Sequence, residues 1–202
     1  MTAYAAPREQ FRAQIREKGS RFLAVIAPAA DELAARSTLA ALEREHPDAT
    51  HHCWAWRLGS PPRERSSDAG EPAGTAGVPI LHVLRGAGLS DVVAVVVRWF
   101  GGTKLGKGGL ARAYAAAVQE ALATLPVVSR VPTARLAVEV SFEKVGAVKR
   151  LLRPPEVELE SEDYLSTAGT AARLVLAVHE GRLAALTEAL ADLGIESPKL
   201  MK

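Results

Sequence analysis

Apolar and polar positions are patterned most clearly in the last third of the chain. Strand-like alternation and helix-like spacing succeed one another there, and paired prolines, Pro154 and Pro155, stop the first helix. Gly194 follows the second helix as a C-terminal cap. The expected segments are strand 136–142, helix 145–152, strand 157–162, strand 172–178, helix 183–193 and strand 195–200. This β-α-β-β-α-β order predicts a ferredoxin-like domain.

The preceding part of the chain is patterned less regularly. Its longest apolar run, 92–97, is unbroken, which is typical of a strand covered on both faces. Asp31 is placed to cap a helix. The expected segments are strand 22–26, helix 31–46, strand 50–58, a polar loop over 60–77, a helix that begins within 79–84, strand 92–100 and a helix that starts near Gly108 and runs to Leu125.

Residues 126–132 separate these two patterns. A chain of 202 residues suits two domains of about 100 residues each. We therefore expect an α+β protein with one domain over 1–130 and a second over 133–202.

Charge is unevenly divided between the two expected domains. Residues 1–132 hold 16 Lys and Arg against 12 Asp and Glu, whereas residues 133–202 hold 9 against 11, which together give the net charge of +2. The basic first domain favours an anionic partner there. Its single cysteine, Cys53, excludes an internal disulfide. Because no apolar run approaches about 18 residues and the N-terminus mixes charges, we expect no membrane span or secretion signal and a cytoplasmic location.

A glycine-rich, basic turn joins the buried strand to the last helix of the first domain. Five glycines fall within 101–109, and the residues from 98 to 112 include four cations and no acid. Glycine lets a backbone approach a ligand, and the N–H groups at a helix start favour phosphate. The spacing of Gly101, Gly106 and Lys107 resembles that of a P-loop. The next residue is Gly108, however, where a P-loop has the Ser or Thr hydroxyl that binds Mg²⁺, and this disfavours a nucleotide hydrolase. The expected anion-binding residues are Arg98, Gly101, Gly102, Lys104, Gly106, Lys107, Gly108, Gly109 and Arg112. A tight turn without a ligand is the alternative.

Two other segments carry candidate chemistry. The polar loop could support the turn, with backbone N–H groups facing it or with two carboxylates as a catalytic pair, or it could be a solvated linker. Its candidate residues are Ser67, Asp68, Glu71, Gly74 and Thr75. On the strand over 50–58, His51 and Cys53 share a face. Two ligands are too few for a structural zinc, so a buried structural role is favoured over a cysteine nucleophile.

Taken together, these segments resemble the IMPACT/YigZ family over residues 18–125. The matching residues are Lys18, 20–22, 49–56, Ser67, Asp68, 70–72, 74–77, 79–81, Val97, Arg98, 100–102, 104–106, 108–110 and 112–114. The chain departs from the usual family residues at His52, Trp56, Ala69, Ala73 and Trp99. Ala69 replaces an acid, which weakens any mechanism that needs two adjacent carboxylates.

The resemblance implies a first domain similar to the second domain of ribosomal protein S5. It also implies a ferredoxin-like second domain resembling a domain of elongation factor G. Eukaryotic relatives act in translational control, so the resemblance implies an RNA, ribosome or translation-factor partner.

We therefore expect a non-enzymatic protein that binds RNA or another phosphate-rich ligand through its first domain, without a cofactor or a metal. The second domain is expected to expose charged residues rather than stacking aromatics. An enzyme or binder of a small phosphorylated ligand, and a protein-interaction module, remain alternatives.

Overall fold

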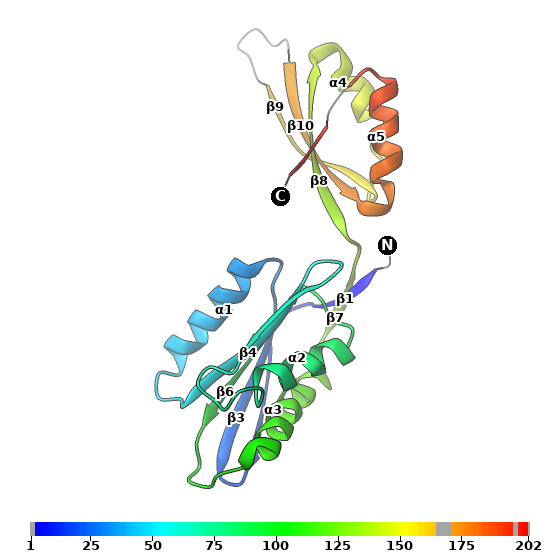
Figure 1. Cartoon of the computed structure of the whole chain (residues 1–202). Coiled ribbons are helices and arrows are strands. Elements are labelled where there is room, and N and C mark those ends of the chain that lie inside the picture. The colour runs from blue at the N-terminus through cyan, green and yellow to red at the C-terminus, as the bar shows by residue number, and fades with distance from the viewer. Residues whose placement is uncertain (1–2, 165–170, 196–197, 202) are drawn as a thin grey trace. The chain divides into compact units, whose positions relative to one another are not determined.

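The computed structural model describes residues 3–164, 171–195 and 198–201. The chain divides into two compact units, Tyr4–Arg130 and a second unit that consists of the residues from Val131 onward together with Ala3 (Figure 1). Both units combine an antiparallel sheet with helices. None of the helices in the described residues is long and apolar enough to cross a membrane.

The first unit is built on a five-stranded antiparallel sheet with the order β2-β3-β6-β4-β5. The central strand β6 carries the unbroken apolar run that the sequence shows, and its side chains from Val92 to Val97 are at most 1% exposed. A separate two-stranded ribbon pairs β1 with β7. The strands are β1 (Tyr4–Pro7), β2 (Phe11–Glu17), β3 (Ser20–Pro28), β4 (His51–Leu58), β5 (Arg63–Ser67), β6 (Val92–Trp99) and β7 (Val127–Arg130).

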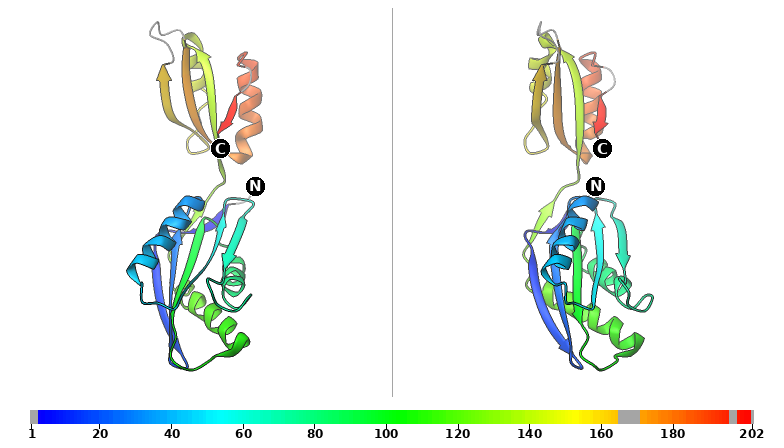
Figure 2. Two further views of the ribbon diagram at one scale, coloured as in Figure 1. Left: turned by 60° about the vertical axis from the view of Figure 1, so that its left-hand side comes forward. Right: turned by 90° about the vertical axis from the view of Figure 1, so that its left-hand side faces the viewer.

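Helices cover both faces of this sheet. Successive residues of a strand point to opposite faces, so Val93 and Val95 of β6 pack with α1 (Glu32–Glu45), whereas Ala94 and Val96 pack with α2 (Gly77–Gly86) and α3 (Gly106–Leu122). Figure 2 shows the sheet between α1 and the other two helices. As predicted, Asp31 caps α1, where its carboxylate accepts a hydrogen bond from the Ala34 N–H at 2.8 Å.

Several predictions for the first unit were incomplete or wrong. The strands β1, β2 and β7 were missed, although Phe11, Ala13 and Ile15 of β2 alternate with polar residues. The expected loop over 60–77 contains β5, whose charged sequence is tolerated because it lies at the sheet edge. Helix α2 begins at Gly77, before the predicted segment 79–84, and α3 ends at Leu122 instead of Leu125.

The second unit has the element order that the sequence predicts, with a sheet ordered β11-β8-β10-β9. Leu136, Val138 and Leu174 lie in the core that α4 and α5 cover. Its elements are β8 (Thr133–Ser141), α4 (Phe142–Lys149), β9 (Val157–Tyr164), β10 (Ala171–His179), the short helix η1 (Glu180–Arg182), α5 (Leu183–Asp192) and β11 (Lys199–Met201).

Element ends differ from the prediction in several places in this unit. Helix α4 begins at Phe142, which was predicted to lie in the preceding strand and is 55% exposed. Helix α4 ends at Lys149 instead of residue 152, because Leu151 and Leu152 pack against the core from the turn that follows. The expected last strand began at residue 195, whereas β11 begins at Lys199, and residues 196–197 lie outside the described part of the chain. Gly194 has a φ of +66°, as expected of a residue that ends a helix.

Candidate anion-binding site

The turn between β6 and α3 packs its backbone directly against the β2–β3 hairpin. A Cβ atom at Gly101 would lie 1.9 Å from the carbonyl carbon of Gly19, so only glycine fits there. Gly102 and Gly106 have φ angles of +86° and +71°, in the region that favours glycine. Three of the five predicted site glycines are therefore required by the turn itself, whatever the turn binds.

Gly108 is not explained by the fold in this way. It lies in the first turn of α3 without a positive φ, and a Cβ there would meet only Arg112 Nη1 at 3.5 Å. At Gly109 a Cβ would lie 3.1 Å from Leu105 Cβ, a tighter contact. A glycine within a helix costs roughly 0.5–1 kcal/mol relative to alanine. Gly108 therefore weakens the helix without a packing reason, which is consistent with a ligand that approaches the backbone.

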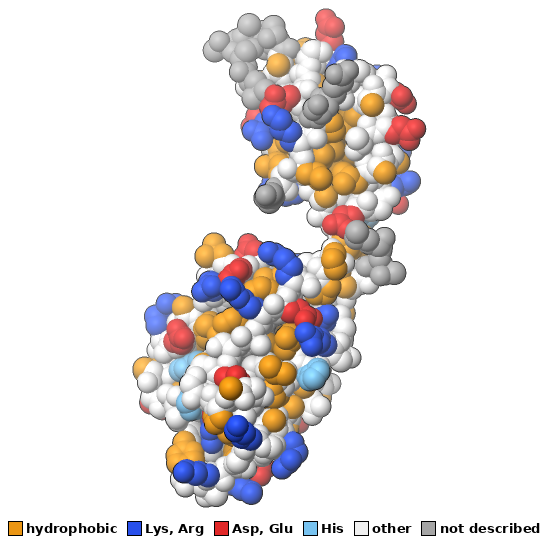
Figure 3. Space-filling view, viewed as in Figure 1, with side chains coloured by type: hydrophobic (Ala, Val, Ile, Leu, Met, Phe, Trp, Pro, Cys, Tyr) orange, Lys and Arg blue, Asp and Glu red, His pale blue; other side chains and the backbone are white. Residues whose placement is uncertain are grey.

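Helix α3 begins without a side-chain cap. Leu105 stands at the N-cap position, where it cannot accept a hydrogen bond, and no acidic residue lies in the first turn. The first N–H groups of the helix therefore lack a partner within it and carry partial positive charge. Lys104, Lys107 and Arg112 are exposed, and none of them forms an ion pair with another described residue. Figure 3 shows Lys and Arg side chains at this end of the first unit and at its opposite end.

Arg98 does not belong to this exposed set, which corrects the prediction that its charge is free to bind an anion. Its side chain is only 6% exposed, and Nη1 donates to Glu71 Oε1 at 2.5 Å. Nη2 donates to Ser20 Oγ at 3.3 Å, whereas Nε is buried and has no partner among the residues that the structure describes. Glu71 is distant in sequence, so the acid-free sequence from 98 to 112 did not reveal that the fold supplies a counter-charge.

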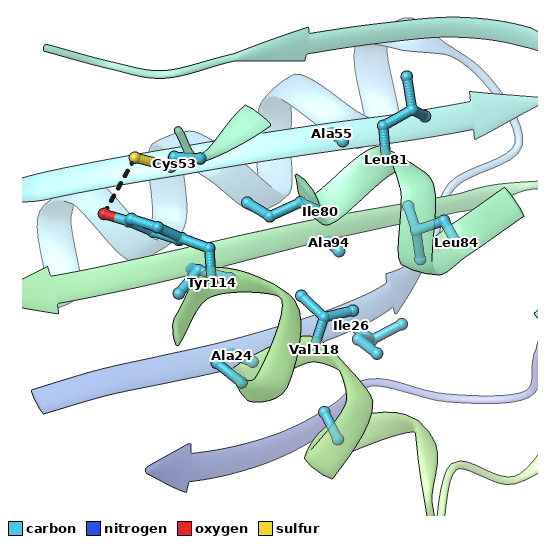
Figure 4. Packing of buried hydrophobic residues seen from close by; sticks show 14 of the residues in the cluster. Ala24, Ile26, Cys53, Ala55, Ile80, Leu81, Leu84, Ala94, Tyr114 and Val118 are labelled. Atoms are coloured by element: carbon cyan, nitrogen blue, oxygen red, sulfur yellow. Dashed lines mark hydrogen bonds between the residues drawn. The ribbon is translucent and has the colours of Figure 1, made fainter. Parts of the chain in front are cut away.

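Glu71 also anchors a buried polar network. It accepts a hydrogen bond from the Tyr114 hydroxyl at 2.7 Å, and that hydroxyl lies 3.3 Å from Cys53 Sγ (Figure 4). Burial is the main cause that raises the pKa of Cys53 to about 12, and burial raises the pKa of Tyr114 as well. The thiol is therefore protonated at neutral pH, which argues against the cysteine-nucleophile alternative.

His51 completes the surroundings of Glu71 but does not make a metal site. Its Nε2 lies 3.9 Å from Glu71 Oε1, and its Nδ1 lies 2.9 Å from the Ala69 carbonyl oxygen. Among the residues that the structure describes, no group of three or more His, Cys, Asp or Glu side chains could hold a metal ion.

The polar loop is held by one carboxylate. Asp68 accepts hydrogen bonds from the backbone N–H groups of Gly74, Ala76 and Gly77 at 2.8–2.9 Å. Partial burial raises the pKa of Asp68, but these hydrogen bonds outweigh that effect and lower it overall. The Thr75 N–H donates to the Pro72 carbonyl. The prediction that the Gly74 and Thr75 N–H groups face the basic turn is therefore wrong, because both are bonded within the loop.

The loop and the turn nevertheless meet at one cavity of about 380 Å³. Five predicted site residues line it, whereas Arg112 lies in a neighbouring depression with Lys18. Sequence reasoning missed Phe100, which also lines the cavity and is 47% exposed. An aromatic residue directly before paired glycines was the available signal. The lining residues are Glu71, Pro72, Arg98, Phe100, Lys104, Leu105, Gly106, Lys107 and Leu110.

Ser67 has only a local role among the predicted supporting residues. It is the last residue of β5, and its hydroxyl accepts the Ala69 N–H at 3.2 Å. Its backbone leaves no room for a Cβ at Gly77, which would lie 2.8 Å from Ser67 N. Ser67 thus fixes the start of the loop where α2 begins.

These features define a class of protein: a two-unit α/β chain whose first unit carries a glycine-rich, uncapped and basic helix start. A family model, the Impact N-terminal domain, matches residues 18–122. The chain belongs to the IMPACT family.

Relatives match over most of the chain. IMPACT family member YigZ of Escherichia coli is 35% identical over 187 residues, which cover 91% of this chain and 90% of YigZ. An IMPACT family member of Thermus thermophilus is 49% identical over 146 residues, covering 72% of this chain and 78% of that protein.

Solved structures give a similar result. The crystal structure of a hypothetical protein is 33% identical, covers 100% of this chain and 97% of its own, and has a TM-score of 0.75. A structure titled as that of the two-domain translational regulator Yih1 is 26% identical and covers 61% of this chain and 47% of its own, with a TM-score of 0.37. That low score adds nothing to the assignment.

Proposed function

We propose that this protein binds RNA, or another phosphate-rich partner, at the start of α3 and does so without catalysis. The observation that carries the proposal is the uncapped helix start with Lys104 and Lys107, which form no ion pair with another described residue. Both lysines line a cavity together with buried Arg98, whose Nε has no hydrogen-bond partner in the described part of the chain. Helix starts with free N–H groups and nearby cations bind phosphate. Membership of the IMPACT family supports a role in translational regulation.

We also infer that the two units are related to domains found in translation. The β-α-β-β-α-β order of the second unit supports a ferredoxin-like assignment, similar to a domain of elongation factor G. The similarity of the first unit to the second domain of ribosomal protein S5 rests on the family resemblance. A ribosome or translation-factor partner and a cytoplasmic location stay predictions on the same basis.

The test is fluorescence anisotropy with purified protein and labelled single-stranded RNA at several salt concentrations. Replacing both lysines in a Lys104→Ala/Lys107→Ala variant should lower the affinity roughly tenfold, because two phosphate contacts are lost. Each contact on a single strand contributes about 0.7 to the slope of log affinity against log salt, so the slope should fall by about 1.4.

Arg8 and Arg63 give a matched control. Both are exposed and without an ion pair among the described residues. Strand pairing places them at the end of the sheet opposite the turn, because Phe11 and Leu58 adjoin the Val92 end of β6. The Arg8→Ala/Arg63→Ala variant loses the same charge and should bind as the wild type does. Equal binding by wild type and the lysine variant would refute the proposal.

A protein-interaction role is a second candidate, favoured by a groove of about 680 Å³ between α2 and α3. Val78, Val83 and Leu122 line it, and Val78 is 49% exposed. A partner that is captured equally before and after nuclease treatment, and is lost when Val78 is replaced by Asp, would favour this role over RNA binding.

A further inference from the structure

The cavity at the start of α3 has opposite charges at two places. Its rim carries the exposed cations Lys104 and Lys107, whereas its lining includes the carboxylate of Glu71, which is 3% exposed. Arg98, the remaining charged residue of the lining, is already paired with Glu71. An inorganic phosphate would be attracted to the rim and repelled from the carboxylate. A site for phosphate alone therefore does not account for the whole lining.

The unused atoms in the cavity indicate what else it can bind. Glu71 Oε1 accepts hydrogen bonds from Arg98 and Tyr114, but Oε2 accepts none from the described residues. A carboxylate oxygen is an acceptor only, so its ligand must present an N–H or O–H donor. The same ligand must also carry the phosphate that binds at the rim, so the donor and the phosphate belong to one molecule.

Phe100 supplies a flat apolar wall beside these polar groups. Its ring is 47% exposed, and its centroid lies 5.6 Å from the Arg98 guanidinium carbon. Pro72 and Leu105 add apolar lining. An exposed aromatic ring next to a cationic groove is the usual platform on which a nucleobase stacks. The volume of about 380 Å³ is at the lower end of the range for small-ligand pockets, about 300–1,000 Å³.

We propose that this cavity binds one unpaired nucleotide, with the base stacked on Phe100 and a base N–H group directed at Glu71. The phosphate then lies at the N-terminus of α3, between Lys104 and Lys107. This inference rests on the proposed function and narrows it, because the bases of a duplex are already stacked and paired and cannot enter the cavity. The ligand chemistry is a purine or pyrimidine carrying a phosphate, either within an RNA strand or as a free nucleotide.

The experiment compares strands of equal charge by fluorescence anisotropy. The probes are a labelled oligoadenylate, an abasic ribose-phosphate strand of the same length and a blunt RNA duplex. Wild-type protein should bind the oligoadenylate about tenfold more tightly than the abasic strand, the gain expected from one stacked base. Phe100→Ala should remove that difference, and Phe100→Trp should restore it. Because Phe100 is half exposed, thermal unfolding should be the same in all three proteins.

Competition distinguishes the two sources of the nucleotide. AMP and ribose 5-phosphate are titrated against bound oligoadenylate. Displacement by AMP alone assigns the site to free nucleotides as well, whereas displacement by neither assigns it to RNA strands.

Two results would overturn the inference while leaving the proposed function intact. They are equal affinity for the base-containing and abasic strands in the wild type, and displacement of the oligoadenylate by AMP and by ribose 5-phosphate to the same measurable extent. Failure of the proposed function is different: the Lys104→Ala/Lys107→Ala variant would then bind every probe as the wild type does.

Discussion

Charged side chains differ in burial and in pairing between the two units of this chain. In the second unit the described ion pairs are solvent-accessible, such as Lys149 with Glu162 and Arg182 with Glu156. In the first unit one ion pair, Arg98 with Glu71, is buried, while Lys104 and Lys107 at the start of α3 have no partner among the described residues.

The difference indicates where binding is expected. A surface ion pair satisfies its own charges at little net gain in free energy, so it offers nothing to a ligand. A buried pair is costly to form, and unpaired cations beside an uncapped helix remain available. Four of the five strand residues predicted to be exposed in the second unit, Arg135, Glu139, Glu158 and Glu160, are exposed, whereas Arg173 is half-buried. The expectation that no aromatic residue is exposed there is wrong, because Tyr164 at the end of β9 is 57% exposed. The proposed binding site nevertheless lies in the first unit, where Lys104 and Lys107 have no ion-pair partner among the described residues.

The largest expected effect tests the buried pair. Glu71→Ala leaves the Arg98 charge buried without a partner, which should lower the free energy of unfolding by about 3–5 kcal/mol. All three tryptophans, Trp54, Trp56 and Trp99, lie in the first unit, so denaturant unfolding followed by tryptophan fluorescence reports on this unit alone.

Its counterpart in the second unit is Glu162→Ala. This change removes one member of an exposed pair, and unfolding followed by circular dichroism should not change measurably. Similar losses for Glu71→Ala and Glu162→Ala would contradict the contrast between the two units.

The same contrast explains how far the sequence could predict the structure. Periodicity reports on burial, so the doubly covered strand β6 and the order of elements in the second unit were predictable. It says little about edge strands, because β5 has the charged sequence Arg-Glu-Arg-Ser-Ser and is ordered by pairing with β4.

The candidate site was only partly predictable for a similar reason. Glycine and lysine spacing located the helix start, since both lie within one local segment. The pairing of Arg98 with Glu71, 27 residues away, depends on the loop that Asp68 organises, and local sequence carries no record of that contact. That Phe100 lines the cavity likewise could not be predicted, because the cavity is formed by segments that are distant in the sequence.

A second, smaller effect tests the buried network in the first unit. The pKa of Cys53 is about 12 in the folded protein, above the value of about 8.5 for an unfolded cysteine. The unfolded protein therefore loses the thiol proton first as the pH rises. The stabilisation is complete below about pH 8.5 and is lost as pH rises toward 12, at about 1.4 kcal/mol per pH unit.

Tryptophan fluorescence should therefore show unfolding free energy falling more steeply above pH 8.5 in wild type than in Cys53→Ala. Tyr114 contributes in the same direction at higher pH. The comparison is therefore made below about pH 10, which is the pKa of an unfolded tyrosine. Parallel slopes for the two proteins would mean that the thiol is not protected by the fold.

The smallest expected effect separates stability from binding. Gly108→Ala adds a methyl group that meets only Arg112 at 3.5 Å, and should stabilise α3 by about 0.5 kcal/mol because alanine favours helix. The same methyl group stands at the helix start where the ligand backbone is expected, so RNA affinity should fall several-fold in the anisotropy assay.

Gly146→Ala is the matched control, since it lies in α4 with no atom within 4 Å of the added Cβ. It should stabilise its helix to a similar extent and leave RNA binding unchanged. If Gly108→Ala gains stability and binds RNA as tightly as Gly146→Ala does, no ligand approaches this helix start closely, and the difference between the units would be one of packing alone.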